Sequence, residues 1–203
     1  MTVNVDLEQY SILLMWGVIT CYAIGMFGFA WSFGQGRETG RKSGNIALSV
    51  TTLGVMLHGL AALLRGLSAQ RVPWGNMYEF SMTGTFGVML VMLVYSYRKD
   101  VRWLGVFVVV PVLLILMVGM LVFYTASAPL VPALRSYWLL IHVTAAIISA
   151  GAFTLGAVIT ALYLLADRAE RRSQAGATPD RFDRIAQRVP NADILDALAY
   201  RIN

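Results

Sequence analysis

The stretch "WLGVFVVVPVLLILMVGMLVFY", residues 103–124, carries no charged side chain. An α-helix needs about 20 consecutive apolar residues to cross the roughly 30 Å hydrocarbon core of a bilayer. This run is long enough, and only one residue in it, Pro111, disfavours a helix. Neighbouring groups in a membrane helix can compensate for such a proline. The stretch therefore predicts a transmembrane helix, and the same length criterion can be applied to the rest of the chain.

Four more apolar runs meet the same length criterion within a few residues. The 203 residues are 58% hydrophobic and 13% charged, with a mean hydropathy of +0.65. A soluble domain of this length cannot bury so much apolar surface. We therefore expect an all-α, polytopic integral membrane protein with about five transmembrane helices in residues 1–166. The predicted spans lie near residues 11–33, 46–64, 80–97, 103–124 and 137–166.

The segment before the first run, "MTVNVDLEQY", is acidic where a secretory signal would be basic. It holds Asp6 and Glu8, and no small-residue cleavage site follows it. We therefore expect the first run to be kept as a transmembrane helix. Cys21, the single cysteine, lies inside that run, so the chain offers neither a disulfide framework nor a CxxC thiol pair.

The cations between the spans predict the orientation, because Lys and Arg near span ends are retained on the cytoplasmic side. Most of them fall in alternate connections, which places the N-terminus outside and the C-terminus in the cytoplasm. Residues 167–190 then form a basic cytoplasmic loop. The cations are dispersed, so we expect contact with the lipid bilayer and no nucleic-acid binding. The connections on the cytoplasmic side hold Arg37, Arg41, Lys42, Arg98, Lys99, Arg102, Arg168, Arg171, Arg172, Arg181, Arg184 and Arg188, and those on the outer side hold Arg65, Arg71 and Arg135.

One outer connection, "RVPWGNMYEF" (residues 71–80), is unusually polar and aromatic. Trp74 and Tyr78 could belong to an ordinary interfacial belt of aromatic side chains. Asn76 could cap the next helix. Glu79 opens that helix, where a carboxylate costs free energy unless it faces protein or water. This combination marks the segment as a candidate functional site.

The two histidines leave two interpretations open. His142 lies in "SYWLLIHVTAAIISAGAF", roughly 7 Å below the outer end of its span at 1.5 Å per residue. Trp138 and Arg135 are close in sequence, and an imidazole in such surroundings can ligate a metal. A lone membrane histidine also commonly forms a hydrogen bond between helices, and this interpretation fits His58 better, because glycines flank it.

Several function classes lack their sequence signals. The chain contains no HExxH, GxSxG or GxxxxGK[ST] motif, and no Asp or Glu lies in the middle of a span. A conventional hydrolase, an ATP-driven pump and a proton-coupled transporter are therefore poorly supported.

Three ordered motifs resemble a known family. They are "VPWGNMYEF" after "LLRGL", then "SYWLLIHV" opening a long later helix, then "ILDALAYRI" after the basic loop. In order and spacing they are similar to the CcsA (ResC) type of cytochrome c biogenesis protein, the haem-handling membrane subunit of System II, which is related to CcmC and CcmF. The resemblance spans nearly the whole chain.

The resemblance implies a function, a cargo and partners. A protein of this kind accepts haem b, presents it at the outer face of the bacterial cytoplasmic membrane and, with a CcsB (ResB) partner, attaches it to the CxxCH cysteines of apocytochrome c. It would be one component of a holocytochrome c synthetase. By position, His142 corresponds to an axial ligand of the haem iron. The haem vestibule would be formed by Trp74, Asn76, Tyr78, Glu79, Arg135 and Trp138, with Arg135 or Arg71 meeting a propionate.

The chain also departs from the family pattern. It contains no WGxxWxWD motif and no second outer histidine ligand. We therefore expect residues 191–203 to be the start of a further helix that is cut off, and the fragment to be inactive alone. The alternative is a membrane scaffold or binding subunit without a cofactor, in which both histidines are packing groups.

Overall fold

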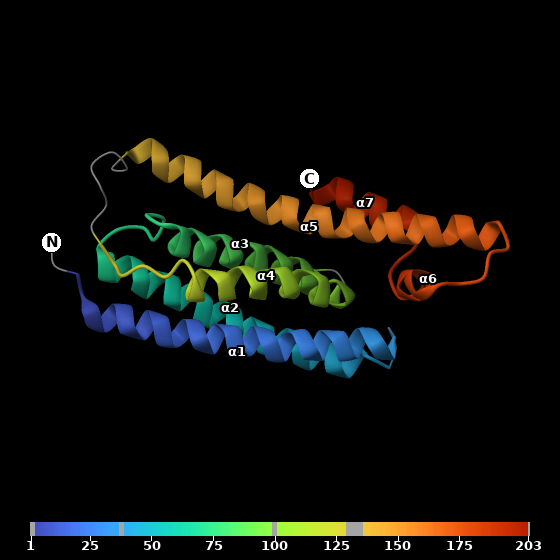
Figure 1. Ribbon diagram of the computed structural model, residues 1–203, viewed down its shortest axis with the longest axis horizontal. Helices are drawn as coiled ribbons and strands as arrows, with labels where there is room; N and C mark the ends of the chain where they lie inside the picture. The colour runs from blue at the N-terminus through green and yellow to red at the C-terminus, as the bar shows by residue number, and fades with distance from the viewer. Residues whose placement is uncertain (1–2, 37–38, 99–100, 129–135, 203) are drawn as a thin grey trace.

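The structure is a computed structural model that describes residues 3–36, 39–98, 101–128 and 136–202. In this part of the chain all regular elements are helical, and five helices are long and apolar enough to cross a membrane. The predicted all-α, multi-pass membrane fold is therefore confirmed. Figure 1 shows these helices side by side in an elongated bundle. The helices are α1 (Val5–Gln35), α2 (Arg41–Ala69), α3 (Met77–Arg98), η1 (Arg102–Leu104), α4 (Gly105–Leu121), α5 (Tyr137–Gln174), α6 (Arg181–Ala186) and α7 (Ala192–Ile202).

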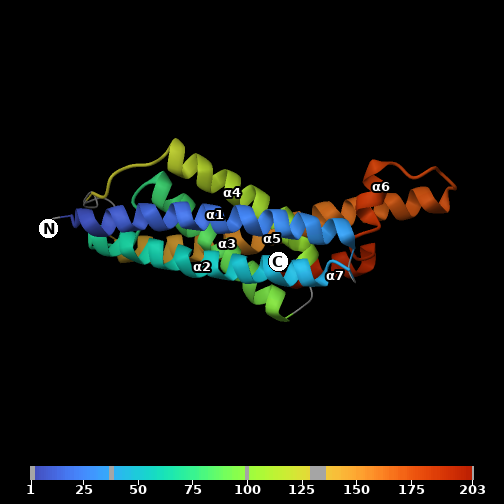
Figure 2. The same ribbon diagram turned by 90° about the horizontal axis from the view of Figure 1, so that it is seen from below.

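Helices α1 and α2 form a tight antiparallel pair, which Figure 2 shows along its length. Small residues allow the two backbones to approach closely. A Cβ atom added to Gly28 would lie 2.8 Å from the Cβ of Ala47, and one added to Gly54 would lie 2.7 Å from the Tyr22 ring. The backbone N–H of Asn4 also donates to the Ser68 carbonyl over 3.1 Å. The two helices are therefore held together by close packing along their length and by a backbone hydrogen bond at one end.

Helices α3 and α4 cover this pair and complete the core. The core is rich in methionine, whose flexible side chain fills irregular gaps between helices. Most outward-facing side chains of the bundle are apolar and exposed, as expected for helices surrounded by lipid. The fully buried methionines are Met15, Met82, Met89 and Met92.

Helix α5 packs against α3 and then continues past the end of the other long helices, where α6 and α7 lie near it (Figure 1). The close approach involves Gly87 of α3 and Gly151 of α5. A Cβ on Gly87 would lie 2.8 Å from Ile147 Cγ2. The buried residues of α5 begin at Gly151, so its first half is largely exposed. Helices α3 and α5 both begin at the end of the bundle where α1 begins, and they run parallel.

The helices differ from the predicted spans mainly at their ends. Helix α1 begins at Val5 because the Asn4 side chain accepts a hydrogen bond from Leu7 N over 3.2 Å. Helix α5 continues to Gln174, well into the segment predicted as a loop. Its end is followed by Gly176 with φ +69, a conformation that glycine adopts without steric cost.

The segment after α5 is organised by local polar contacts. Asp180 and Asp183 form a capping box at the start of α6, and Arg168 Nη2 lies 2.6 Å from Asp180 Oδ2. The hydrogen bond from the Asp183 backbone N–H, assisted by Arg168, holds the pKa of the Asp180 carboxyl below its ordinary value. Residues Ala192–Ile202 form α7, which packs on α5.

Candidate functional site

The segment between α2 and α3 folds around the carboxylate of Glu79. The Gly75 backbone N–H donates to Glu79 Oε2 over 2.8 Å, and Glu79 N donates to Asn76 Oδ1 over 2.8 Å. Asn76 therefore caps the start of α3, which confirms that prediction. Gly75 leaves room for the Arg71 guanidinium, because a Cβ there would lie 2.7 Å from Arg71 Nη1. The sequence "RVPWGNMYEF" is thus a compact turn built on one acid.

Arg65 is the most deeply buried cation among the residues that the structure describes, and it links three other parts of the chain. Its side chain is fully buried, with Nε 3.0 Å from Glu79 Oε1 and Nη1 2.9 Å from Glu8 Oε1. Nη2 donates to the Thr125 carbonyl. One guanidinium therefore fastens the first turn of α3, the start of α1 and the chain after α4 to the end of α2.

Arg71 supplies the second cation. Its Nη1 lies 2.6 Å from Glu79 Oε2 and its Nη2 lies 3.1 Å from Glu79 Oε1, a bidentate pair. Its Nε donates to the Ala128 carbonyl over 3.0 Å. We call Glu8, Arg65, Arg71 and Glu79 the Glu79 cluster. Its two carboxylates and two guanidinium groups balance in charge, as buried ions require.

Two tyrosines line the Glu79 cluster. The Tyr124 hydroxyl donates to Glu8 Oε1 over 2.9 Å, and the Arg65 guanidinium lies 5.2 Å from the centre of the Tyr78 ring. The two rings contact edge to face at 5.3 Å. The Tyr78 hydroxyl is buried and has no hydrogen-bond partner among the described residues. The two tyrosine rings and the Glu79 cluster thus pack together at this end of the bundle.

The second group of predicted site residues lies on α5. Trp138 is 77% exposed, and His142 is exposed as well. Gly87 and Gly151 contact each other, since a Cβ on Gly151 would lie 3.6 Å from Gly87 C. At 1.5 Å per residue Glu79 lies about 12 Å before Gly87 and His142 about 13.5 Å before Gly151, so both stand at a similar height in the bundle. Within the described ranges no hydrogen bond, ion pair or ring contact joins Trp138 or His142 to the Glu79 cluster. Arg135 lies outside the described residues.

His58 is a buried bridge between helices. Its Nδ1 lies 3.2 Å from the Tyr22 hydroxyl of α1, and the Phe86 ring of α3 contacts it edge to face at 5.5 Å between ring centres. This is the helix-to-helix hydrogen bond that the sequence favoured for this residue.

The described residues contain no group of three or more His, Cys, Asp or Glu side chains that could hold a bare metal ion. The His142 imidazole is exposed and lies among exposed aromatic and apolar side chains of α5. Trp138, Tyr137 and Ile141 are the exposed side chains in this position.

Fold and site together define a multi-pass, all-α membrane protein with a charged and aromatic end. Residues 74–203 match the family described as Cytochrome C assembly protein. The chain belongs to this family, as its motifs predicted.

Curated relatives agree with the family match. The chain is 33% identical to the cytochrome c biogenesis protein CcsA of Picosynechococcus sp. over 139 residues, which cover 63% of this chain and 40% of the relative. It is 34% identical to CcsA of Microcystis aeruginosa over 129 residues, which cover 59% of this chain and 38% of that protein. The chain thus spans about 40% of the length of the curated relatives it matches. No solved structure matches the chain.

Proposed function

We propose that this protein binds haem b as cargo at the outer face of a bacterial cytoplasmic membrane, for attachment to apocytochrome c together with a CcsB/ResB-type partner. His142 is the axial ligand of the haem iron. Three observations support this: membership of the cytochrome c assembly family, the exposure of the imidazole, and its position level with the Glu79 cluster. The exposed imidazole on α5 carries most of the argument.

The orientation is part of this proposal. The Glu79 cluster faces the outside, and the end that holds η1 and α7 faces the cytoplasm, because most cations lie at the latter end.

A labelling experiment tests the orientation. Cys21 is the single cysteine, so a Cys21→Ala protein can receive one new thiol at a time. We expect a membrane-impermeant maleimide to label Val72→Cys, which is 43% exposed, in right-side-out vesicles. Lys42→Cys, at the opposite end, is expected to react only after lysis. The reverse pattern would show that the bundle is inverted.

The residues of the outer segment take different roles in the proposal. Trp74 and Trp138 contact the porphyrin face, where apolar and aromatic surface is favourable. Asn76 and Glu79 are positioning residues, because their hydrogen bonds fix the turn that carries Trp74. Tyr78 is a positioning residue because its buried ring packs against the Arg65 guanidinium. Arg71 is held by Glu79, so Arg135 is the proposed partner of a propionate.

The chemistry proposed for this chain is binding and orientation. Haem supplies the iron and the vinyl groups that are attached to cysteine thiols. The imidazole of His142 fixes the iron, and the aromatic side chains keep water from one face of the plate. The exposed face of α5 leaves access for a protein substrate.

The visible spectrum of the purified protein tests the proposal. We expect the wild-type protein with added haem to show the Soret band of bound haem. His142→Ala is expected to weaken haem affinity by more than about tenfold, because loss of a residue that merely hydrogen-bonds to a metal ligand already costs roughly that much. His58→Gln is the matched control, because it changes the buried imidazole and leaves the exposed one. A wild-type protein that takes up no haem would favour the scaffold function without a cofactor.

A further inference from the structure

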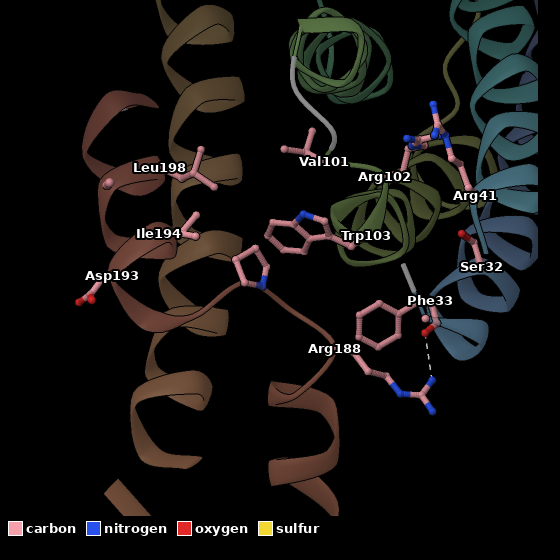
Figure 3. A pocket seen from close by; sticks show the side chains of 13 residues that line it. Ser32, Phe33, Arg41, Val101, Arg102, Trp103, Arg188, Asp193, Ile194 and Leu198 are labelled. Carbon is pink, nitrogen blue, oxygen red and sulfur yellow. Dashed lines mark hydrogen bonds between the residues drawn. The ribbon is translucent and has the colours of Figure 1, made fainter. Parts of the chain in front are cut away.

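A cavity lies at the end of the bundle opposite to the Glu79 cluster. Its volume is about 560 Å³, and three regions that are distant in sequence line it: the turn where α1 ends and α2 begins, η1 with its preceding residue, and the chain from Arg188 into α7. Figure 3 shows these segments converging around the Trp103 indole. The cavity is therefore a product of the tertiary fold.

One side of the cavity is cationic. Arg41, Arg102 and Arg188 line it, and Arg102 Cδ lies 3.4 Å from the position of a Cβ on Gly44, about one helical turn after Arg41. Arg188 donates to the Phe33 and Gly34 carbonyls at the end of α1, over 3.0 and 2.7 Å. Arg102 donates to the Asn45 side chain. Arg41 is exposed and makes no hydrogen bond or ion pair within the described part of the chain.

The acid in the lining lies apart from Arg41. Asp193 lies on α7 across the cavity, and in Figure 3 its carboxylate points away from the arginines. It is exposed to solvent. A negatively charged ligand would therefore be attracted to Arg41, which makes no ion pair within the described residues.

The other side of the cavity is apolar. Trp103 projects between the arginines and α7, and Ile194 and Leu198 of α7 face it (Figure 3). Ile194 is 50% exposed, and Trp103 is partly buried. A free inorganic anion would gain nothing from these side chains. A ligand that joins an anionic group to an apolar chain would use both sides.

The cavity also lies at the right depth for such a ligand. Helix α1 ends at Gln35 and α2 begins at Arg41, so the lining residues Phe33 and Arg41 mark where the two membrane-spanning helices meet the interface. Basic pockets between transmembrane helices at this level bind anionic lipid head groups.

We propose that this cavity binds an anionic phospholipid, with the phosphate at Arg41 and Arg102 and the upper acyl chains against Trp103, Ile194 and Leu198. The lipid fills the gap between the α1–α2 pair and α7. The proposal does not depend on haem binding, because it concerns the opposite end of the bundle.

Lipid retention measured by native mass spectrometry tests this site. After exchange into detergent with defined lipids, we expect the wild-type protein to retain phosphatidylglycerol in preference to phosphatidylcholine. Arg41→Gln is expected to weaken this binding about fivefold, the effect of losing one cation beside an anionic lipid. Lys42→Gln is the matched control, because Lys42 is the exposed neighbour of Arg41 and does not line the cavity. Equal losses in both variants would overturn the proposal.

Two further experiments ask whether the bound anion is a lipid or free phosphate, and whether the lipid binds in this cavity. Millimolar inorganic phosphate is expected not to displace the lipid, and displacement would indicate a site for the free anion. Brominated phosphatidylglycerol is expected to quench the tryptophan emission of the wild-type protein more than that of Trp103→Phe. Equal quenching would show that the lipid binds elsewhere. This result does not depend on whether the Arg41 variant is stable.

Discussion

Replacing Arg65 with Met is expected to destabilise the bundle by about 3–5 kcal/mol, the usual result of removing one partner from a buried ion pair. Glu8 and Glu79 would both lose Arg65, and within the described residues Glu8 has no other cation. Glu79 would keep Arg71. A buried, unpaired carboxylate is costly, so the start of α1 should detach from the end of α2. The free energy of unfolding in detergent is the measurement.

Arg171→Met provides the control for Arg65→Met. Arg171 forms an ion pair with Asp167 over 2.9 Å, and its side chain is 76% exposed. Exposed pairs contribute about 0–1 kcal/mol, so this variant should be nearly as stable as the wild type. Adding Glu8→Gln to Arg65→Met should cost less than the sum of the two single changes, because the neutral amide removes the unpaired charge. Simple additivity would contradict the proposed coupling between these residues.

Replacing Gly87 with Leu is expected to separate the first part of α5 from α3 and to remove the proposed haem binding through His142. Ile147 Cγ2 lies 2.8 Å from the position of a Cβ on Gly87, so a leucine side chain cannot fit without movement of α5. Overpacking of this kind typically costs about 1–3 kcal/mol. Amide hydrogen exchange in α5 around Ile147 should become faster, while the α1–α2 pair stays protected.

Gly84→Leu is the matched control, one helical turn away on the same helix. A Cβ on Gly84 meets nothing within 4 Å, so this leucine can point outward. Both variants lose one glycine from α3, and only Gly87→Leu should affect α5. If Gly87→Leu speeds exchange in α5 but leaves the haem spectrum intact, the placement of haem on α5 is wrong. If exchange is unchanged, the packing argument is wrong.

Much of the fold could be predicted because the bilayer sets a length that sequence can be measured against. The five apolar runs correspond to α1 to α5, and each helix core falls where the hydropathy predicts. The ends were less predictable, because caps and turns decide them. Asn4 extends α1 over the acidic residues Asp6 and Glu8, which hydropathy alone excludes from a span. Helix α5 continues to Gln174 through charged residues that form local ion pairs.

In the candidate site, too, local contacts could be predicted from the sequence and long-range contacts could not. Asn76 as a cap was predictable, because its partner is three residues away. The pairing of Arg65 with Glu8 was not, because these residues are 57 positions apart and only the packing of α1 on α2 joins them. In the sequence Arg65 served only as a charge marker for the membrane orientation, and Glu8 only as an indication against a secretory signal. A polar residue near a span end should therefore also be examined as one half of a possible ion pair.

The uneven burial of α5 has a mechanical consequence. Its 38 residues extend about 57 Å at 1.5 Å per residue, and its buried positions begin only at Gly151. The residues of α5 before Gly151 are exposed or only partly buried, so this segment is supported mainly from its buried end. His142 is thus held by the stiffness of a helix, and its reach can change with a small bend that leaves the core untouched.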